Sequence, residues 1–271
     1  MFSQYNPDKS FYKITKKCIF NFDYLYFFIC FSLDIKQILP KVGKILKSLF
    51  ITVCGQKGGV AKTCTSVHLA SVWDRQGKNV CIVDADKNRS ALAYASRGNL
   101  PFPVFPVSAA AKASRGSDIV ITDGQASSDE EELKHLAYGS DLVIIPTTPK
   151  ARSVELTVEL ANLLNTLKVN HAVLIVKVDS RKQKAALQAR AALQKFGLEV
   201  FDGFIPLLSA FDKAEASGNA VYEAVDDLGR SDPRRMTGWS AYCSIASQIS
   251  CLISKPLSDT NSSNNQIPIS A

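Results

Sequence analysis

The stretch FITVCGQKGGVAKTCT, residues 50–65, decides the fold of this chain. Its first five residues form an apolar run typical of a buried strand, and a glycine loop follows directly. From residue 65 to residue 75 the apolar side chains recur at helical spacing. A strand, a glycine loop and a helix in this order are the setting of a phosphate-binding loop, because the loop amides and the amino end of the helix face the anion together.

The loop departs from the usual pattern GxxxxGK[ST]. Lys62 and Thr63 fit the end of the pattern, where a lysine reaches the β- and γ-phosphates and a hydroxyl binds Mg²⁺. Gln56 and Ala61 occupy the two glycine positions, and the glycines lie instead inside KGGVAK, residues 57–62. Because Ala61 opens the helix, we expect it to need no positive φ. The second lysine, five residues before the first, needs its own explanation.

Composition places the chain among globular proteins of reducing compartments. Its 271 residues are 46% hydrophobic and 21% charged, which suits one α/β domain of about 200 residues with tails. The seven cysteines show no CxxC pair and no metal-ligand spacing, so we expect reduced thiols and no disulfide framework. Of the net charge of +7, residues 1–50 hold +5, from eight lysines and three aspartates. Attraction to nucleic acid therefore has to come from a local basic patch.

The first 48 residues differ from the rest of the chain. Residues 1–50 hold 12 of the 24 aromatic residues, many of them in CIFNFDYLYFFICFSL at residues 18–33. With lysines before it, this run is a candidate signal anchor, but it is short for a spanning helix, contains Asp23 and lacks a small-residue cleavage site. We therefore assign residues 1–48 to an N-terminal extension, either a poorly structured or apolar segment or sequence from a misassigned start.

Apolar runs alternate with helix-like segments along the rest of the chain. They lie at residues 50–54, 79–86, 118–124, 141–149, 171–179 and 199–206. Because these runs are continuous, they are typical of strands covered on both faces, and the sequence predicts an α/β fold with a doubly wound, mostly parallel sheet. We expect one domain over residues 49–253 and a polar, disordered tail over residues 254–271.

Acidic residues end two of these runs. Asp84 and Asp86 close the second run, and Asp123 closes the third. A single aspartate at such a place is usually a turn residue or a helix cap, but ligands of open α/β sheets bind at the carboxyl ends of the strands. Three aspartates behind a phosphate loop therefore predict a site for a metal-bound nucleotide, with Asp123 in the position of a Walker B carboxylate.

Together these features resemble the ParA/MinD-type deviant Walker ATPases, whose phosphate loop is spelled KGGxxK[ST]. The resemblance extends from residue 50 to about residue 250. It comprises KGGVAKT at residues 57–63, DAD at 84–86, DG at 123–124 and DLVIIPTTP at 141–149. Within that group the chain looks most like the small ParA proteins that partition plasmids or position cargo, because residues 204–224 and 238–249 resemble their C-terminal helices.

The resemblance implies a role for each residue of the site. ATP is held by the loop, which here means Gly58, Gly59, Val60, Ala61, Lys62, Thr63 and Cys64. Mg²⁺ is implied at Thr63 and Asp123, with Asp84 in support. Catalysis falls to Lys57, Lys62 and Asp86, which orients the attacking water.

Lys57 matches the signature lysine that crosses to the partner's nucleotide in an ATP-bound homodimer of this family. Two features depart from the family pattern. Lys87 stands where proline usually follows DxD, and Gln125 and Ala126 replace a segment that commonly contains proline.

Residues 180–197 carry the signal for nucleic-acid binding. Helical spacing separates an outward set, Arg181, Lys184, Gln188 and Lys195, from an inward set, Ala186, Ala189, Leu193 and Phe196. Gly197 ends the predicted helix, and Arg230, Arg234 and Arg235 extend the basic set. Such a face is often merely solvated. Phosphate contacts of this kind would give the sequence-independent, salt-sensitive DNA binding that ParA-type proteins show.

These features favour a slow, Mg²⁺-dependent ATPase, stimulated by a ParB-like or other small partner protein. We expect it to dimerise with ATP, to bind DNA nonspecifically at the nucleoid in the cytoplasm, and to segregate plasmid or chromosomal DNA. McdA-like positioning of a protein cargo such as the carboxysome is the near alternative. A MinD-like membrane ATPase is less favoured, because the chain ends in Ser/Asn-rich sequence and not in a basic amphipathic helix. A noncatalytic DNA-coating scaffold would use nucleotide only structurally.

Overall fold

The computed structural model describes residues 48–127 and 129–254. Its centre is a six-stranded parallel sheet in the order β3-β2-β4-β1-β5-β6. The strands are β1 (Leu49–Gly55), β2 (Val80–Ala85), β3 (Val104–Pro106), β4 (Ile119–Ala126), β5 (Leu142–Thr147) and β6 (His171–Ile175). The predicted α/β class and the predicted parallel sheet are confirmed.

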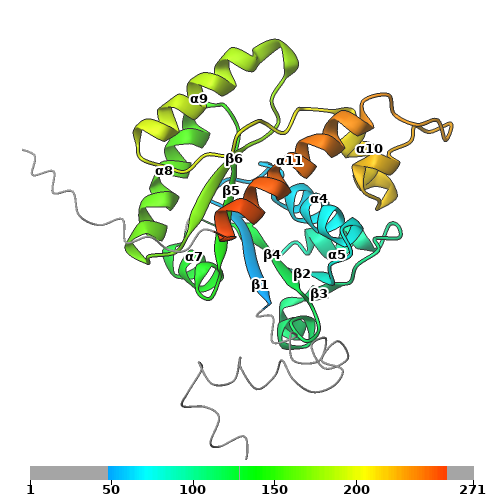
Figure 1. Ribbon diagram of the computed structural model, residues 1–271, viewed down its shortest axis with the longest axis horizontal. Coiled ribbons are helices and arrows are strands. Elements are labelled where there is room, and N and C mark those ends of the chain that lie inside the picture. Colours follow the sequence, from blue (N-terminus) through cyan, green and yellow to red (C-terminus); the bar gives the residue numbers. More distant parts are fainter. Residues whose placement is uncertain (1–47, 128, 255–271) are drawn as a thin grey trace, which may run out of the picture. The chain divides into compact units, whose positions relative to one another are not determined.

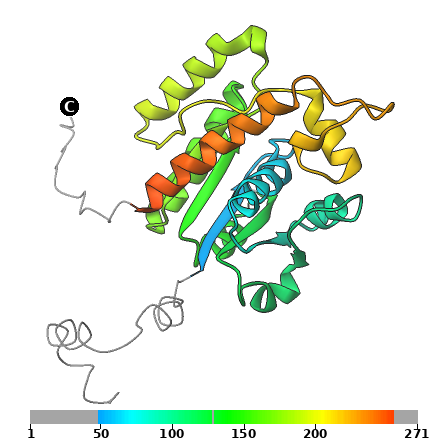
Figure 2. The ribbon, with the colours of Figure 1, turned by 45° about the vertical axis from the view of Figure 1, so that its right-hand side comes forward.

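Helices cover both faces of the sheet, as a doubly wound fold requires. The helices are α4 (Lys62–Arg75), α5 (Ser90–Ala95), α6 (Ala110–Ala113), α7 (Glu130–Ala137), α8 (Ala151–Thr166), α9 (Gln183–Lys195), α10 (Ser209–Ser217) and α11 (Arg235–Ser254). Short 3₁₀ turns are η3 (Val107–Ala109), η4 (Ser180–Lys182) and η5 (Val221–Glu223). Helices α4 and α11 run side by side over one face (Figures 1 and 2), and α7, α8 and α9 cover the other.

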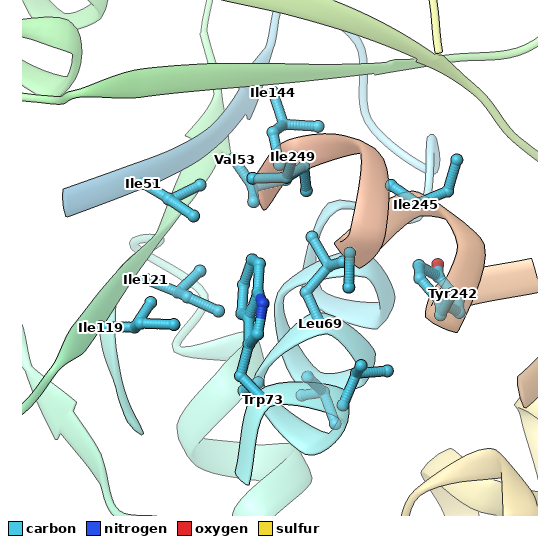
Figure 3. Close-up of a cluster of buried hydrophobic side chains, with 14 of the residues drawn as sticks. Ile51, Val53, Leu69, Trp73, Ile119, Ile121, Ile144, Tyr242, Ile245 and Ile249 are labelled. Carbon is cyan, nitrogen blue, oxygen red and sulfur yellow. The ribbon is translucent and has the colours of Figure 1, made fainter. Parts of the chain in front are cut away.

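The larger core layer lies between the sheet and the pair α4 and α11. Trp73 of α4 packs among the β-branched side chains of the central strands, such as Ile51 and Ile121 (Figure 3). Ile245 and Ile249 of α11 extend the same cluster. Burying side chains of this size contributes about 1.5–3 kcal/mol each. The last helix described is therefore fixed against the helix that follows the phosphate loop.

The second core layer lies on the opposite face. Val143 and Ile145 of β5 pack there with Leu160 of α8 and Leu193 of α9, whereas Ile144, between them in the strand, belongs to the first layer. Since successive side chains of a strand point to opposite faces, β5 is buried on both sides. This explains why its sequence is a continuous apolar run.

The strand predicted at residues 199–206 is not formed as a regular strand. This segment runs beside β6 but makes only two isolated parallel bridges, Val173 with Val200 and Val178 with Pro206. Gly203, at φ 88°, turns the chain between these bridges, and Pro206 has no N–H for a ladder. The sixth strand of the sheet is instead β3, whose three residues are too few to give a period in the sequence.

The predicted N-terminal extension (residues 1–48) and tail (residues 254–271) lie outside the described residues, apart from Ser48 and Ser254. The candidate anchor at residues 18–33 is also outside them. In the described ranges, no helix combines the length and the apolar character needed to cross a bilayer.

Candidate functional site

The phosphate loop joins the carboxyl end of β1 to the amino end of α4. Gly59 adopts φ 73°, a left-handed conformation that glycine reaches without strain. At Gly58, an added Cβ would meet no atom within 4 Å. The packing of the protein itself therefore does not require glycine at residue 58, and the bare backbone leaves room for a ligand to approach the loop.

Ala61 differs from the expectation that it needs no positive φ. It is the N-cap of α4 and has φ 58° and ψ 35°, which is left-handed. For a residue with a Cβ this conformation costs about 1 kcal/mol. The expectation was wrong because the chain reverses at Ala61 itself, before the first helical residue, Lys62. Backbone strain of this kind tends to cluster at ligand-binding sites.

Strand register brings the predicted acidic residues to one edge of the sheet. Asp84 of β2 pairs with Asp123 of β4, and Val53 of β1 pairs with Asp123 from the other side. At Gly124, an added Cβ would lie 3.0 Å from the Cβ of Cys54 and 3.1 Å from the Val53 carbonyl oxygen. A side chain after Asp123 would therefore force β1 and β4 apart by a few tenths of an ångström, and glycine fits their close approach.

Lys62 holds a nearly buried ammonium group inside the loop. The residue is 8% exposed, and its Nζ donates to the carbonyl oxygen of Lys57 at 3.3 Å. Burial lowers the pKa of Lys62, while the charges of Asp123 and Asp86 act in the opposite direction. Since a buried charge is costly unless it is paired, this lysine is suited to a phosphate in the loop.

Thr63, Ser66 and Asp123 form one hydrogen-bonded group. The Thr63 hydroxyl donates to Asp123 Oδ2 at 2.7 Å, and the Ser66 hydroxyl donates to Oδ1 at 2.8 Å. Asp123 is fully buried, and burial raises its pKa to about 7 despite these bonds. A hydroxyl beside a carboxylate fits Mg²⁺, which usually takes one or two protein carboxylates and completes its shell with water and phosphate oxygens. Among the described residues, no group of three or more His, Cys, Asp or Glu could hold a metal.

Asp84 and Asp86 organise the loop after β2. Asp84 is 4% exposed, and its carboxylate accepts the N–H of Asp86 at 3.0 Å and that of Leu92 at 2.9 Å. The Asp86 carboxylate accepts the N–H of Asn88 at 2.9 Å and the hydroxyl of Ser90 at 3.2 Å. The geometry favours loop support over metal ligation for Asp84. Metal ligation by Asp84 and water orientation by Asp86 stay predictions.

Lys57 contacts a different element from Lys62. Its Nζ donates to Ser153 Oγ of α8 at 3.2 Å, and Ser153 shares a hydrogen bond of 2.8 Å with Thr148. Lys57 lines a small space of about 10 Å³ beside α8, whereas Lys62 lines a cavity of about 270 Å³ on the other side. The side chains of the two loop lysines therefore lie in different surroundings.

The 270 Å³ cavity beside Lys62, called the loop cavity below, has a wall that the sequence did not identify. Opposite the loop it is lined by Lys177, Pro206, Leu207, Leu208, Asp212 and Glu215. The available signal was position, because Lys177 and Pro206 both lie in apolar runs that end at the same edge of the sheet as the phosphate loop. A nucleotide held by its phosphates in the loop would place its sugar and base toward this wall.

The first turns of α4 are anchored to the C-terminal part of the chain. His68 is fully buried, donates from Nδ1 to the carbonyl oxygen of Cys64 at 2.7 Å and accepts the N–H of Val221 at 3.0 Å. Burial lowers the pKa of His68 to about 4 and raises that of Cys64 to about 12, so both are neutral at pH 7. The Tyr242 ring of α11 stacks on His68 at a centroid distance of 5.0 Å. We therefore expect Cys64 to contribute its backbone, and not a thiolate, to ligand binding.

The residues predicted to contact DNA, together called the basic surface below, lie in η4, in α9, in the segment before α11 and at the first residue of α11: Arg181, Lys184, Lys195, Arg230, Arg234 and Arg235. Two of its arginines are already paired. Arg181 bonds to Asp179 at 2.8 and 3.1 Å, and Arg230 bonds to Asp226 at 2.8 Å. Lys184 and Lys195 are exposed and have no ion pair within the described ranges.

The faces of α9 agree with the predicted spacing at all but one position. Ala186, Ala189 and Leu193 are buried, and Gly197 ends the helix at φ 75°. Phe196, predicted to point inward, is 65% exposed. It lies beyond the last helical residue, where the chain has already turned, so Leu198 fills the buried place instead.

Arg234 of the basic surface lines a second cavity, of about 330 Å³, between the start of α9 and the start of α11. Ser180 and Gln183 line it from the α9 side, and Arg234, Thr237 and Ser240 line it from the α11 side. Residues separated by some 50 positions in the sequence are thus brought to one place.

Comparison with protein families gives one match over the whole site. The model described as the CobQ/CobB/MinD/ParA nucleotide binding domain matches residues 51–221. This span holds the phosphate loop, the three aspartates and the lining of the loop cavity.

Two curated proteins illustrate the range of relatives. Maintenance of carboxysome distribution protein A from Gloeobacter kilaueensis is 27% identical over 181 residues, which are 64% of this chain and 83% of that protein. Protein ParA from Rhizobium radiobacter is 26% identical over 169 residues, which are 56% of this chain and 75% of that protein.

Solved structures agree on the fold. The MinD cell division protein of Aquifex aeolicus matches with a TM-score of 0.60 at 15% identity, covering 83% of this chain and 100% of that one. The septum site-determining protein MinD of Pyrococcus horikoshii, complexed with Mg-ADP, matches with a TM-score of 0.56 at 14% identity, covering 76% of this chain and 98% of that one. At such identities the likeness shows the fold alone.

Proposed function

The chain belongs to the CobQ/CobB/MinD/ParA nucleotide-binding family, and we propose that it is a slow, Mg²⁺-dependent ATPase that forms a homodimer with ATP and positions a cargo along DNA. The observation that carries the proposal is the separation of the two loop lysines. Lys62 lines the loop cavity, and Lys57 lies on the α8 side of the loop. Lys62 would meet the phosphates of its own ATP, and Lys57 those of the partner's ATP.

The contact of Lys57 is of a kind that can be exchanged. Its partner, the Ser153 hydroxyl, is neutral, and the hydrogen bond is long at 3.2 Å. The bond to Ser153 joins a charged donor to a neutral acceptor, whereas a bond to phosphate joins two opposite charges and is therefore the stronger of the two. Lys57 would therefore leave Ser153 when a second protomer presents a triphosphate, and dimerisation would depend on the γ-phosphate.

The residues around Asp123 fit the hydrolytic step. When bound, Mg²⁺ supplies charge neutralisation at the phosphates. Thr63 and Asp123, which share a hydrogen bond, would hold it, and Lys62 would add a second positive charge within the loop. Asp86, whose carboxylate is oriented by Asn88 and Ser90, would hold the attacking water.

DNA binding is proposed for the basic surface. Its support is the exposed pair Lys184 and Lys195 together with the cavity that Arg234 lines. A dimer would double this surface, and phosphate contacts of this type are independent of sequence and sensitive to salt. We propose that the protein acts in the cytoplasm on the nucleoid.

Two cargoes are proposed, and the relatives support them equally. One is plasmid or chromosomal DNA, segregated through a ParB-like partner protein. The other is a protein cargo such as the carboxysome, positioned through a small adaptor protein. Both cargoes would use the same ATPase core. Identifying the partner protein that stimulates hydrolysis would therefore distinguish between the two proposals.

The test is duplex-DNA binding by the full chain with Mg²⁺-ATP and with Mg²⁺-ADP, at two salt concentrations, alongside the mass of the protein in solution. We expect a dimer and DNA binding with ATP only, with weaker binding at the higher salt concentration. Lys57→Ala should stay monomeric and lose DNA binding while still binding ATP.

Lys168→Ala, which removes a lysine far from the loop, serves as the matched control and should behave as the unchanged chain. DNA binding that is equal with ATP and ADP would refute the proposed dependence of DNA binding on ATP. Absence of hydrolysis would favour a noncatalytic scaffold.

A further inference from the structure

The loops after β2 and β4 leave adjacent strands. Asp84 and Ala85 of β2 pair with Asp123 and Gly124 of β4 in register. The first loop carries Asp86 and Lys87, and the second continues through buried Ser127 to α7, while buried Gln125 lies near the end of β4 itself. Both loops therefore start beside the candidate Mg²⁺ site.

Glu132 of α7 joins these two loops. It is the third residue of the helix, where a glutamate commonly turns back to the N–H of the N-cap residue, here Asp129. That N–H instead donates to the Ser127 hydroxyl at 3.1 Å. The Glu132 carboxylate lies 3.2 Å from Lys87 Nζ and interacts with the side chains of Ser127 and Gln125 as well. The Ser127 contact, followed by Lys87, holds the pKa of Glu132 below its usual range.

We propose that Lys87 and Glu132 are positioning residues for Asp86, which link the loop after β2 to the loop after β4 through one ion pair. Lys87 follows Asp86 directly, so the position of its side chain constrains the backbone that presents the Asp86 carboxylate. Because hydrolysis depends steeply on the placement of such a group, the ion pair would tune turnover. This inference rests on the proposed ATPase function.

The ion pair is partly exposed, which bounds its effect. The side chain of Lys87 is 79% exposed and that of Glu132 is 30% exposed. Pairs of this kind are weak and are screened by salt. The expected change in turnover is therefore about two- to fivefold, and it should shrink at high ionic strength.

The experiment is a double-mutant cycle on ATP turnover with Lys87→Ala, Glu132→Gln and the two combined. Each single variant should lower kcat by about two- to fivefold with little change in KM, and the combined variant should fall no further, because both changes remove the same ion pair. Lys87→Arg should restore kcat. At high salt the differences should disappear.

Glu131→Gln is the matched control. It breaks the 2.7 Å ion pair with Lys134, which lies within α7 and joins no loops, so kcat should stay unchanged. If the single losses multiply in the combined variant, or if Glu131→Gln lowers kcat equally, the positioning role is refuted.

Limited trypsin digestion separates this inference from the proposed function. The loop after β2 contains Lys87 and Arg89, at which trypsin cleaves. In the full chain without nucleotide, cleavage there should be faster in Glu132→Gln than in Glu131→Gln. If the chain hydrolyses no ATP but still shows this difference in cleavage, the proposed ATPase activity and the role of the ion pair in positioning Asp86 are both refuted. The structural link between the two loops would still stand. Equal cleavage would refute the link itself.

Discussion

The phosphate loop and the basic surface both gather positive charge, but the fold constrains them differently. In the loop, Lys62 is 8% exposed, and the neighbouring Thr63 is bonded to a buried carboxylate at 2.7 Å. On the basic surface, Lys184 is exposed, and Arg181 is already bonded to its neighbour Asp179. Charge in the first region is left for a ligand, whereas part of the charge in the second is neutralised by the protein itself.

This difference shows what a sequence pattern can predict. Residues of the loop are fixed by the order of strands and by backbone geometry, so their spacing in the sequence determines where they meet. Residues of an exposed helix face are placed on a surface, but their pairing depends on nearby carboxylates at other positions. A match in spacing is therefore strong evidence in the loop and weak evidence on the surface.

The largest expected effect comes from Lys62→Ala. Removing a buried positive charge from the phosphates should lower ATP turnover by about 100-fold or more, the usual loss when one charge-stabilising group is deleted from such a site. Turnover at saturating Mg²⁺-ATP is the measurement. Lys184→Ala is the matched control and should leave turnover unchanged, and equal losses in both would contradict the difference drawn between the two regions.

Most of the fold and of the loop could be predicted from the sequence. Continuous apolar runs indicated five of the six strands, because strands buried on both faces need such runs. The short β3 gives no period, and the irregular course of residues 199–206 depends on Gly203 and Pro206. Within the site, the left-handed conformation of Ala61 follows from the path of the chain and not from its residue type.

Contacts between distant segments were beyond the sequence. The ion pair of Lys87 with Glu132 and the contact of Lys57 with Ser153 join residues 45 and 96 positions apart. No period or motif encodes such pairs, because only the packing of α7 and α8 against the sheet brings them together. The wall of the loop cavity was missed for the same reason.

Asp123 is expected to lower the stability of the folded chain at neutral pH although ATP hydrolysis requires it. Its pKa is raised from 3.8 to about 7 by burial. The contribution of this group to stability is therefore complete below about pH 4 and is lost as the pH rises through 7. At 1.4 kcal/mol per pKa unit, the full cost at pH 8 is at most about 4 kcal/mol.

Asp123→Asn should remove this cost. Without Mg²⁺ and nucleotide, the variant should unfold at a higher denaturant concentration than the unchanged chain at pH 8 and at the same concentration near pH 4, while ATP turnover is lost. Denaturant unfolding at both pH values is the measurement, and Asp227→Asn, at an exposed position, is the control. If Asp123→Asn is instead less stable than the unchanged chain at pH 8, interactions within the folded chain offset the cost of burying the charged Asp123 carboxylate.

The smallest expected effect tests the basic surface. Lys184→Ala should weaken DNA binding with ATP by about threefold and should reduce the slope of log affinity against log salt by about 1 for each phosphate that Lys184 neutralises. Arg181→Ala should change it less, because two hydrogen bonds to Asp179 already hold that guanidinium and lower the pKa of Asp179 to about 2. Asp179→Asn should then strengthen binding, since it frees the positive charge of Arg181 for a phosphate. If Arg181→Ala instead weakens binding more than Lys184→Ala, DNA phosphates compete successfully with Asp179. The charge of this surface would then be as available to a ligand as that of the loop.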